Sequence, residues 1–532
     1  MSPLLLSVSV LGVDLCSPLA LAVLLPLLYV LHTVWLHRGS SRANPIVWSW
    51  VPHLRSALLF GQDPNAFLAQ CRDRYGPVFT LNLGGKLMTF VTDPAAFPLI
   101  TRSRAGLSFT AVAAGVGQTV LSQSKDFSDD QELDQLIHAL YPKHLAGAGL
   151  DELTQRFQQH LNQWLRTNMQ TEAAARSGSG SGSGGAVQCG LLDLCTRPIF
   201  SASTRALFGD LLVDDGNANP AKFDQNFSDD FQQPKKLLGA FQKFDEVFPL
   251  LYGGVPKFVI RAGVEARDSM IEMLKSLRAD TSSFIRERRE LIVEGNPTPR
   301  PATDTADFAA STLGLLWALH ANTIPACFWT VFYLLRQPAA MRRVRDEVRA
   351  VVAAEGGADG EIGREALKKM TLLDAAISEA LRLTTGSMML RRATQDITLE
   401  LPTGPLPLKR DANICIYPYL THHDPSIYAD PEEFKLDRFA TTPVESSTVT
   451  DVQGRKVPCG FLPFGAGISL CPGRHFARNE IKLFLVTLLD LVDLEPTVAP
   501  ADLKHPGHLL SRAGLGIFPP AHDIQVRYTP KL

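Results

Sequence analysis

Apolar residues recur at helical spacing along most of the chain. Residues 474–491 keep a period close to that of an α-helix, residues 372–383 do the same, and residues 127–170 are expected to be mainly helical. Residues 78–91 differ, because two short apolar runs flank a Gly-Gly pair, a pattern typical of a β-hairpin. The chain is therefore predicted to be mainly α-helical, with small β regions.

Residues 313–335 form a long stretch that is apolar on all sides. Its length would allow it to span a membrane, for which about 20 apolar residues suffice. Polar residues gather at its centre, however, at His320, Asn322 and Thr323, and Pro325 removes a backbone hydrogen bond there. We therefore predict a kinked helix in the core that lines a cavity.

Residues 15–36 are predicted to span a membrane, because they are apolar with few exceptions. No Lys or Arg precedes them and basic residues follow, which favours a retained anchor over a cleaved signal peptide. The positive-inside rule then places the bulk of the chain on the cytosolic side of the membrane. Residues 1–42 are thus expected to form an anchor with a basic stop, and residues 43–532 one large folded domain.

Three segments of the large domain are unusual in composition. Residues 177–185 contain only Ser and Gly, which predicts a flexible surface insertion that cannot bury a core. Residues 223–248 carry repeated phenylalanines, and half or more of these are expected to be ordinary helix core. The apolar residues 249–260 that follow are predicted to form a loop that is difficult to bury.

Composition excludes some classes of partner and site. Hydrophobic residues make up 45% of the chain and suit a globular core, while a formal net charge of -2 gives no general attraction to nucleic acid. The eight cysteines are scattered, so neither a zinc site nor a disulfide framework is expected. Scattered thiols fit a reducing domain that faces the cytosol.

The most informative cysteine is Cys471, within residues 463–473. Three glycines in this segment allow backbone turns closed to other residues and let a flat ligand approach closely. Because the predicted helix 474–491 follows at once, Cys471 lies at a helix N-terminus, where unpaired amide groups favour a thiolate. A lone cysteine is more often a small buried hydrophobe. A dinucleotide-binding loop is excluded because Leu470 occupies the position of its third glycine.

Four residues of this segment, Phe464, Gly467, Cys471 and Gly473, fit the pattern Phe-x-x-Gly-x-x-x-Cys-x-Gly. This is the haem-binding loop of the cytochrome P-450 (haem-thiolate) family, which the chain resembles from about residue 40 to its end. The resemblance implies the cytochrome P-450 fold, haem b held by these residues and Gly465, and Cys471 as the axial thiolate ligand of the iron. It also implies electrons from NADPH, delivered by NADPH-cytochrome P-450 reductase, and a location at the endoplasmic reticulum membrane.

The loop departs from the family pattern at Ser469. The family usually has a basic residue at this position, two before the cysteine, where it faces a haem propionate. Arg391, which follows the Glu-x-x-Arg helix of the family, is our candidate for the residue that serves the propionate instead. Residues 127–170 contain no Trp-x-x-x-Arg motif, which many relatives use to bind a propionate.

Glu379 and Arg382 lie three residues apart on the predicted helix 372–383 and face the same side. Such pairs are common on solvated helices and usually contribute little to stability. Together with Arg438 downstream, however, they match the buried Glu-Arg-Arg network of the family, which holds the proximal side of the haem.

Two further groups of charged residues bear on metal binding and on the docking of a partner. His422, His423 and Asp424 resemble an ordinary His-x-Asp-Pro loop of the family, so no metal beyond the haem iron is expected. The reductase is expected to dock on the proximal side, although scattered surface charge is an equally good reading of the residues concerned. The basic patch predicted there consists of Lys409, Arg410, Arg474, Arg478 and Lys482.

The core helix narrows the resemblance to a branch of the family. Asn322 replaces the usual acid of an acid-alcohol pair and Thr323 keeps the alcohol, as in the sterol 7α-hydroxylases, with sterol 12α-hydroxylase and prostacyclin synthase as cousins. The resemblance implies Thr323 and Asn322 as catalytic residues, and Asn322, Trp317, Leu515 and Gly516 as sterol contacts. His320 departs from the neutral residue expected there, which leaves the shape of the cavity open.

The predicted function is hydroxylation of a sterol, at the 7α position, by a haem-thiolate monooxygenase of sterol and bile acid metabolism. Three alternatives stay open: sterol 12α-hydroxylation, isomerisation of a prostaglandin endoperoxide, and a haem-binding sensor or carrier without turnover. Thr323 argues against the isomerase, which needs no proton delivery to oxygen. The complete set of oxygen-activating residues argues against the carrier.

Overall fold

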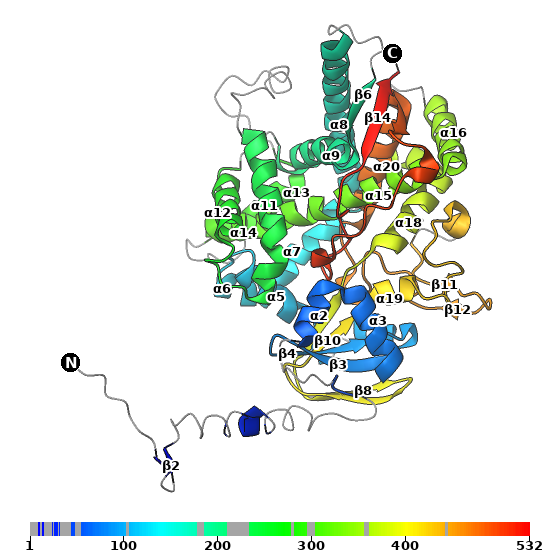
Figure 1. Ribbon diagram of the computed structural model, residues 1–532. Helices are drawn as coiled ribbons and strands as arrows, with labels where there is room; N and C mark the ends of the chain where they lie inside the picture. The colour runs from blue at the N-terminus through cyan, green and yellow to red at the C-terminus, as the bar shows by residue number, and fades with distance from the viewer. Residues whose placement is uncertain are drawn as a thin grey trace.

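The structure, a computed structural model, has a large helical part and a smaller part rich in β-strands (Figure 1). It describes residues 9–10, 13–14, 24, 26–29, 31, 44–47, 55–102, 106–177, 186–209, 233–277, 281–294, 304–355, 361–441 and 445–531. The long helices are α7 (Gln131–His144), α8 (Gly147–Ser177), α9 (Leu191–Phe208), α11 (Gln233–Gly253), α12 (Arg261–Lys275), α13 (Ser283–Val293), α14 (Asp304–Ala321), α15 (Thr323–Arg336), α16 (Pro338–Ala354), α18 (Thr371–Thr384) and α20 (Arg474–Leu491). The remaining α-helices are α2 (Arg55–Gln62), α3 (Pro64–Tyr75), α4 (Phe97–Arg102), α5 (Thr110–Thr119), α6 (Lys125–Asp129), α17 (Arg364–Lys369) and α19 (Pro418–His422).

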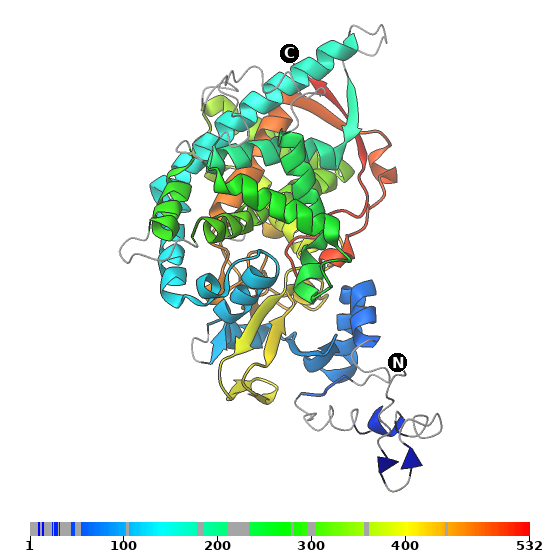
Figure 2. The same ribbon diagram turned by 90° about the vertical axis from the view of Figure 1, so that its left-hand side faces the viewer.

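The largest sheet has five strands in the order β3-β4-β10-β7-β5. They are β3 (Val78–Leu83), β4 (Lys86–Val91), β10 (Asn413–Ile416), β7 (Met389–Ala393) and β5 (Leu107–Ser108). β10 pairs with β4 in parallel, and the other pairs are antiparallel. β3 and β4 form the predicted hairpin, in which the Asn82 side chain accepts a hydrogen bond from the Gly85 amide at 2.9 Å. In Figures 1 and 2 this sheet lies with α2 and α3 at one end of the molecule, below the helices.

The remaining strands form smaller sheets of two or three strands. One contains β13 (Val492–Pro496), β14 (Gln525–Pro530) and β6 (Val187–Gly190), and another pairs β8 (Ile397–Leu401) with β9 (Gly404–Leu408). Two-stranded pairs form between β11 (Val449–Thr450) and β12 (Lys456–Val457) and between β1 (Ser9–Val10) and β2 (Val13–Asp14). The prediction of a mainly helical chain with small β regions is therefore confirmed.

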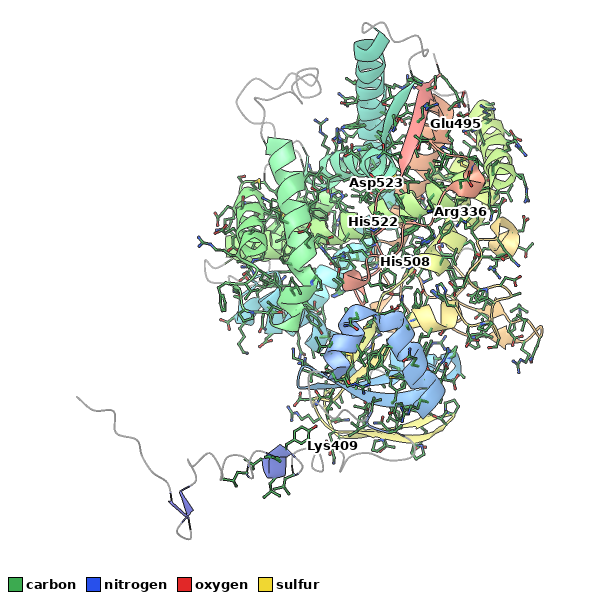
Figure 3. All side chains as sticks on the ribbon, in the orientation of Figure 1. Arg336, Lys409, Glu495, His508, His522 and Asp523 are labelled. Carbon is green, nitrogen blue, oxygen red and sulfur yellow. The ribbon has the colours of Figure 1, made fainter. Side chains whose placement is uncertain are left out.

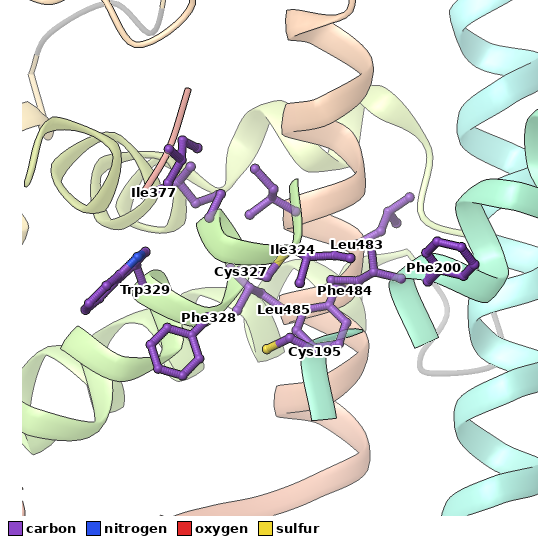
Figure 4. Packing of buried hydrophobic residues seen from close by; sticks show 14 of the residues in the cluster. Cys195, Phe200, Ile324, Cys327, Phe328, Trp329, Ile377, Leu483, Phe484 and Leu485 are labelled. Carbon is purple, nitrogen blue, oxygen red and sulfur yellow. The ribbon is translucent and has the colours of Figure 1, made fainter. Parts of the chain in front are cut away.

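α15 runs through the centre of the protein, and its residues from Thr323 to Leu335 are all buried. It packs against α9, α18 and α20, so the helix that follows the cysteine loop and the helix of the apolar stretch share one core. Figure 4 shows this packing among Cys195, Phe200, Ile324, Cys327, Phe328, Trp329, Ile377, Leu483, Phe484 and Leu485.

The long apolar stretch is a core helix broken once, at Asn322, between α14 and α15. Pro325 has no N–H, so the carbonyl of Ala321 lacks its usual partner in the helix. The segment Thr305–Arg336 is, among the described residues, the one helix long and apolar enough to cross a membrane, and 72% of its most apolar window is buried inside the protein. The prediction of a kinked core helix is confirmed, although the helix begins at Asp304, earlier than expected.

The predicted loop 249–260 is wrong in its first residues, because α11 continues through Pro249 to Gly253. A proline inside a helix leaves the carbonyl four residues earlier without its donor. Here that carbonyl belongs to Asp245, and it accepts a hydrogen bond from the Arg512 guanidinium at 3.1 Å. A residue from the far end of the chain therefore satisfies the backbone and allows the helix to continue.

Several sequence predictions fall outside the described residues. They are the anchor within residues 15–36, of which only a few positions are described, nearly all of the Ser/Gly insertion 177–185, and the phenylalanines of residues 223–231. The remaining phenylalanines of that run, Phe241, Phe244 and Phe248, are buried on α11, as expected for helix core.

Candidate haem-thiolate site

The loop that carries Cys471 is closed by its own backbone. The amide of Cys471 donates to the carbonyl of Phe464 at 2.9 Å, and α20 begins at Arg474, as the sequence predicts. Burial raises the pKa of the Cys471 thiol, whereas the amides of Gly473 and Arg474, which donate toward the sulfur, lower it. The start of α20 therefore supplies the donors that stabilise a thiolate.

The glycines of this loop are needed for two different reasons. Gly465 and Gly467 have φ values of 75° and 63°, a backbone conformation that residues with a side chain rarely adopt. A Cβ atom at Gly467 would also lie 2.1 Å from the carbonyl oxygen of Thr101, at the end of α4, so the loop packs directly on that helix. Gly473 is the residue before α20, and a Cβ there would lie 4.0 Å from the Cys471 sulfur.

Arg391, on β7, is 1% exposed and reaches the position where the loop lacks its basic residue. Its guanidinium donates to the Ser469 hydroxyl at 2.7 Å and to the Leu390 carbonyl at 2.8 Å. Its Nε has no hydrogen-bond partner, and no carboxylate pairs with it in the part of the chain that the structure describes. A buried cation with a free donor and no counter-ion fits the carboxylate of a cofactor.

Glu379 accepts hydrogen bonds from two arginines. The Nε atoms of Arg382 and Arg438 each lie 2.8 Å from a Glu379 carboxylate oxygen, and neither Glu379 nor Arg382 is exposed. Arg382 also donates to the carbonyls of His422 and Pro431, both at 2.7 Å. The structure therefore brings together the three residues that the sequence groups as a network, and joins them to the chain before the cysteine loop.

A cavity of about 380 Å³ lies beside α14. Trp317 and Ala318 line it from that helix, and Phe248 lines it from α11. The Trp317 ring stacks on Phe248 with centroids 4.0 Å apart and donates its N–H to the Asp245 carboxylate at 2.7 Å. The predicted contact Trp317 therefore does face a cavity.

Asp245 is held in turn by Arg512, whose guanidinium lies 2.8 Å from its carboxylate. Burial raises the pKa of Asp245, while Arg512 and Trp317 oppose that shift. This pair ties α11 to the C-terminal segment, and the sequence analysis missed it. Nothing in a single sequence joins positions 267 residues apart.

Asn322 contacts the C-terminal segment rather than the cavity described above. Its side-chain oxygen accepts a hydrogen bond from the Ile517 amide at 2.9 Å, and a Cβ atom at Gly516 would lie 1.9 Å from that oxygen. Leu515 is partly buried against the main core. Thr323 is 3% exposed, and its hydroxyl has no hydrogen-bond partner among the described residues. The structure thus joins Asn322 to Gly516 at the helix break, and Thr323 and Leu515 are their neighbours along the chain.

His320 does not shape the cavity, contrary to the possibility raised by the sequence. Its ring is fully buried, lies 4.3 Å from the Phe200 ring, and places Nε2 3.0 Å from the Thr204 hydroxyl of α9. Burial lowers the pKa of His320 to about 3, so the ring is neutral. His320 is therefore part of the packing between α14 and α9.

The predicted basic patch is wrong for two of its five residues. Arg478 and Lys482 are 9% and 4% exposed, because α18 covers this side of α20 and places Asp374 against both cations. Lys409 is exposed but pairs with Asp396 at 2.7 Å, and it follows β9 directly, near the bottom of the β-rich part in Figure 3. The five residues do not form one surface.

The neighbouring residues His422, His423 and Asp424 have three separate partners. His422 accepts a hydrogen bond from the Leu462 amide at 3.0 Å, and His423 lies 2.8 Å from Glu432. Asp424 accepts from the Ser426 amide at 2.8 Å. Each of the three side chains therefore contacts a different residue of the surrounding loops.

The fold and the loop around Cys471 define a haem-thiolate protein. The sequence model of the family described as Cytochrome P450 matches residues 43–517, and the chain belongs to that family. Membership implies a haem-thiolate cofactor and a redox partner that supplies electrons.

Three curated relatives narrow the comparison. The chain is 32% identical over 511 residues to Cytochrome P450 7A1 of Rattus norvegicus, covering 94% of this chain and 96% of the relative. It is 32% identical over 506 residues to Cholesterol 7-alpha-monooxygenase of Cricetulus griseus, covering 93% and 95%. It is 29% identical over 497 residues to 7-alpha-hydroxycholest-4-en-3-one 12-alpha-hydroxylase of Oryctolagus cuniculus, covering 90% and 92%. The chain is a cytochrome P450 monooxygenase related to sterol 7α- and 12α-hydroxylases.

Proposed function

We propose that this monooxygenase hydroxylates a sterol, cholesterol or an oxysterol, at the 7α position, as a step of sterol and bile acid metabolism. The observation that carries the proposal is the cysteine loop with Arg391 at Ser469, in a chain whose relatives include a cholesterol 7-alpha-monooxygenase. The test is a titration of the haem absorbance with a panel of sterols, since binding next to the iron displaces its water and shifts the spectrum. A spectrum that no sterol shifts would contradict the proposal.

The residues present fit haem b. Cys471 would ligate the iron, Phe464 and the three loop glycines would lie against the ring, and Arg391 would pair with a propionate through its free Nε. When bound, a haem with a thiolate ligand supplies the cleavage of dioxygen and the oxidation of an unactivated C–H bond. The electrons would come from NADPH through NADPH-cytochrome P-450 reductase.

The polypeptide contributes proton delivery and substrate position. Thr323, whose hydroxyl has no partner among the described residues, would hold a water that donates protons during oxygen activation. The side-chain oxygen of Asn322 accepts a hydrogen bond from the Ile517 amide. Its side-chain NH2 group is therefore the donor available to a sterol hydroxyl. Asn322 therefore sets the position of Gly516 and Ile517, and its amide nitrogen would contact a sterol that reaches the helix break.

Thr323→Ala is expected to bind sterol and consume NADPH at near wild-type rates, but to release peroxide in place of most of the hydroxylated product. The reason is that the proton-donating water loses the hydroxyl that holds it. Product and peroxide are counted in the same reaction. Thr330→Ala is the matched control, because the Thr330 hydroxyl on the same helix donates a hydrogen bond to the Ala326 carbonyl. Equal coupling in wild type and Thr323→Ala would remove Thr323 from the relay.

The 12α position is the second candidate, because one relative is named as a 12-alpha-hydroxylase. The two activities differ in which carbon of the ring system is held over the iron. In this chain that position depends on Trp317, which the Asp245–Arg512 pair holds against Phe248. Mass spectrometric assignment of the hydroxylated carbon decides between the two candidates.

We further propose that the enzyme acts at the endoplasmic reticulum membrane, with the catalytic domain in the cytosol. Besides the predicted anchor, an apolar surface lies where α11 ends. Leu250, Phe258 and Val259 are 43%, 81% and 62% exposed. Exposed apolar patches of this kind mark membrane or protein contacts, and this one would let a sterol enter from the bilayer.

Deletion of residues 1–36 is expected to leave part of the protein on membranes, because this apolar surface is a second attachment. Adding Phe258→Asp and Val259→Asp to the deletion should release the protein, since a charge opposes insertion into lipid. Flotation with liposomes measures the bound fraction. Val498→Asp, at an exposed valine elsewhere, is the control. Complete release by the deletion alone would contradict the second attachment.

A further inference from the structure

The cavity beside α14 is lined mostly by apolar side chains but contains one buried cation. Its apolar lining includes Phe109, Val112, Leu133, Ile137 and Leu315. A volume of about 380 Å³ with few polar groups is typical of a site for a small organic ligand. The cation is Arg288, which reaches the cavity from α13.

Arg288 occupies a position where the sequence pattern calls for an apolar residue. The buried face of α13 consists of Phe284, Ile285, Arg288 and Ile292, at helical spacing. Arg288 is 3% exposed, and burial of an arginine is rare unless an anion accompanies it. The sequence alone thus shows a basic residue on the apolar face of a helix. It does not show that this face borders a cavity.

The structure gives Arg288 a free donor surface. Its Nε and Nη1 have no hydrogen-bond partner, and no carboxylate forms an ion pair with it within the described ranges of the chain. Its polar neighbour is Tyr141 of α7, which also lines the cavity. Burial lowers the pKa of Arg288, and Tyr141 opposes that shift. An arginine side chain is effectively always protonated in proteins, so the guanidinium carries a charge.

The other ionisable side chains that line the cavity do not neutralise Arg288. They are Asp134 and His138 of α7, which pair with each other at 3.4 Å and are 38% and 55% exposed. This pair lies at the solvent side, whereas Arg288 is enclosed. An anion inside the cavity would therefore meet the guanidinium in apolar surroundings, where their attraction is little screened.

We propose that Arg288 binds an anionic group of the substrate, so that this enzyme acts on a sterol that carries a carboxylate or a sulfate. The inference rests on the proposed sterol hydroxylase function. A planar guanidinium with two free donors matches the paired oxygens of either anion, and the apolar lining accommodates the ring system. With its charged end on α13, the substrate extends toward Trp317 and Ala318 of α14, on the side of the helix break.

The test is a spectral titration with three probes: cholesterol, cholesterol carrying a carboxylate at the end of its side chain, and cholesterol 3-sulfate. Wild type is expected to bind one of the two anions more tightly than cholesterol, which also shows whether the charge sits on the side chain or on ring A. Arg288→Met should weaken the binding of that anion by on the order of tenfold to a hundredfold and leave the affinity for cholesterol unchanged. Arg288→Lys should retain part of the preference, and Arg286→Met, an exposed arginine on the same helix, all of it.

A second readout separates this role from a structural one. If Arg288 has no anion in the protein itself, Arg288→Met removes a buried unpaired charge, and the thermal midpoint should stay level or rise. Haem content should also be unchanged. A fall in haem content would assign Arg288 to a propionate and overturn the inference.

Two other outcomes are equally decisive. In the first, wild type binds cholesterol and both anions with equal affinity, or Arg288→Met lowers the affinity for all three probes equally. Either result shows that Arg288 does not bind the anionic group, and it overturns this inference without affecting the sterol hydroxylase function. If none of the three probes shifts the spectrum, the sterol hydroxylase function fails and the inference fails with it.

Discussion

Cys471→Ser is expected to abolish the long-wavelength absorbance band that the reduced, carbon monoxide-bound protein shows when a thiolate ligates the iron. An alcohol at neutral pH is a poor anionic ligand, and the amides of Gly473 and Arg474 that stabilise a thiolate cannot make serine ionise. Hydroxylase activity should be lost together with the band.

Cys459→Ser is the matched control. Cys459 is also a free cysteine, twelve positions before Cys471, and it is buried outside the loop that closes on Phe464. The control should keep the band at wild-type intensity. A Cys471→Ser protein with an unshifted, wild-type band would show that another residue ligates the iron.

Glu379→Ala is expected to lower the free energy of unfolding by about 3–5 kcal/mol, because it strands Arg382 and Arg438 without their shared carboxylate. Haem retention should fall with stability, since Arg382 also holds the carbonyls of His422 and Pro431. The His422 ring in turn accepts a hydrogen bond from the Leu462 amide, just before the cysteine loop. The measurements are a denaturant titration of the purified protein and the ratio of haem to polypeptide.

The control for Glu379→Ala is Asp437→Ala. Asp437 pairs with Arg343 at 2.7 Å, but the two side chains are 65% and 50% exposed, so solvent and salt screen the pair. Its loss should move the unfolding midpoint very little. If the two variants unfold at the same midpoint with full haem content, Glu379 contributes no more than a surface bridge.

The local elements were predictable because each depends on residues close together in sequence. α20 begins at Arg474 and ends at Leu491, as the apolar period indicates, and the hairpin β3–β4 follows from two short runs around Gly84 and Gly85. The cysteine loop is equally local, since its turns need glycines at fixed positions. Pattern and turn chemistry suffice for features of this kind.

The contacts that complete the site could not be predicted, because they join distant segments. Asp245 and Arg512 meet only after α11 folds onto the C-terminal segment, and the same contact explains why Pro249 does not end the helix. Likewise, the direction of His320 depends on α9, which buries it against Phe200 and away from the cavity.

The basic patch failed for a related reason. Arg478 and Lys482 stand on what looks like the polar face of α20, where charged residues are normally solvated. α18 covers that face and supplies Asp374 as a buried counter-ion to both. A single sequence shows the cations but not the helix that covers them, so a docking surface for the reductase cannot be read from their number.

The most direct test of the central claim is analysis of the products formed by purified enzyme with reductase, NADPH and a sterol. The account predicts a sterol with one added hydroxyl group at C7 in the α orientation, formed only when NADPH and dioxygen are both present. Incubation with a prostaglandin endoperoxide in the absence of NADPH is the parallel reaction. Conversion of the endoperoxide, with every sterol left unchanged, would contradict the monooxygenase and favour an isomerase.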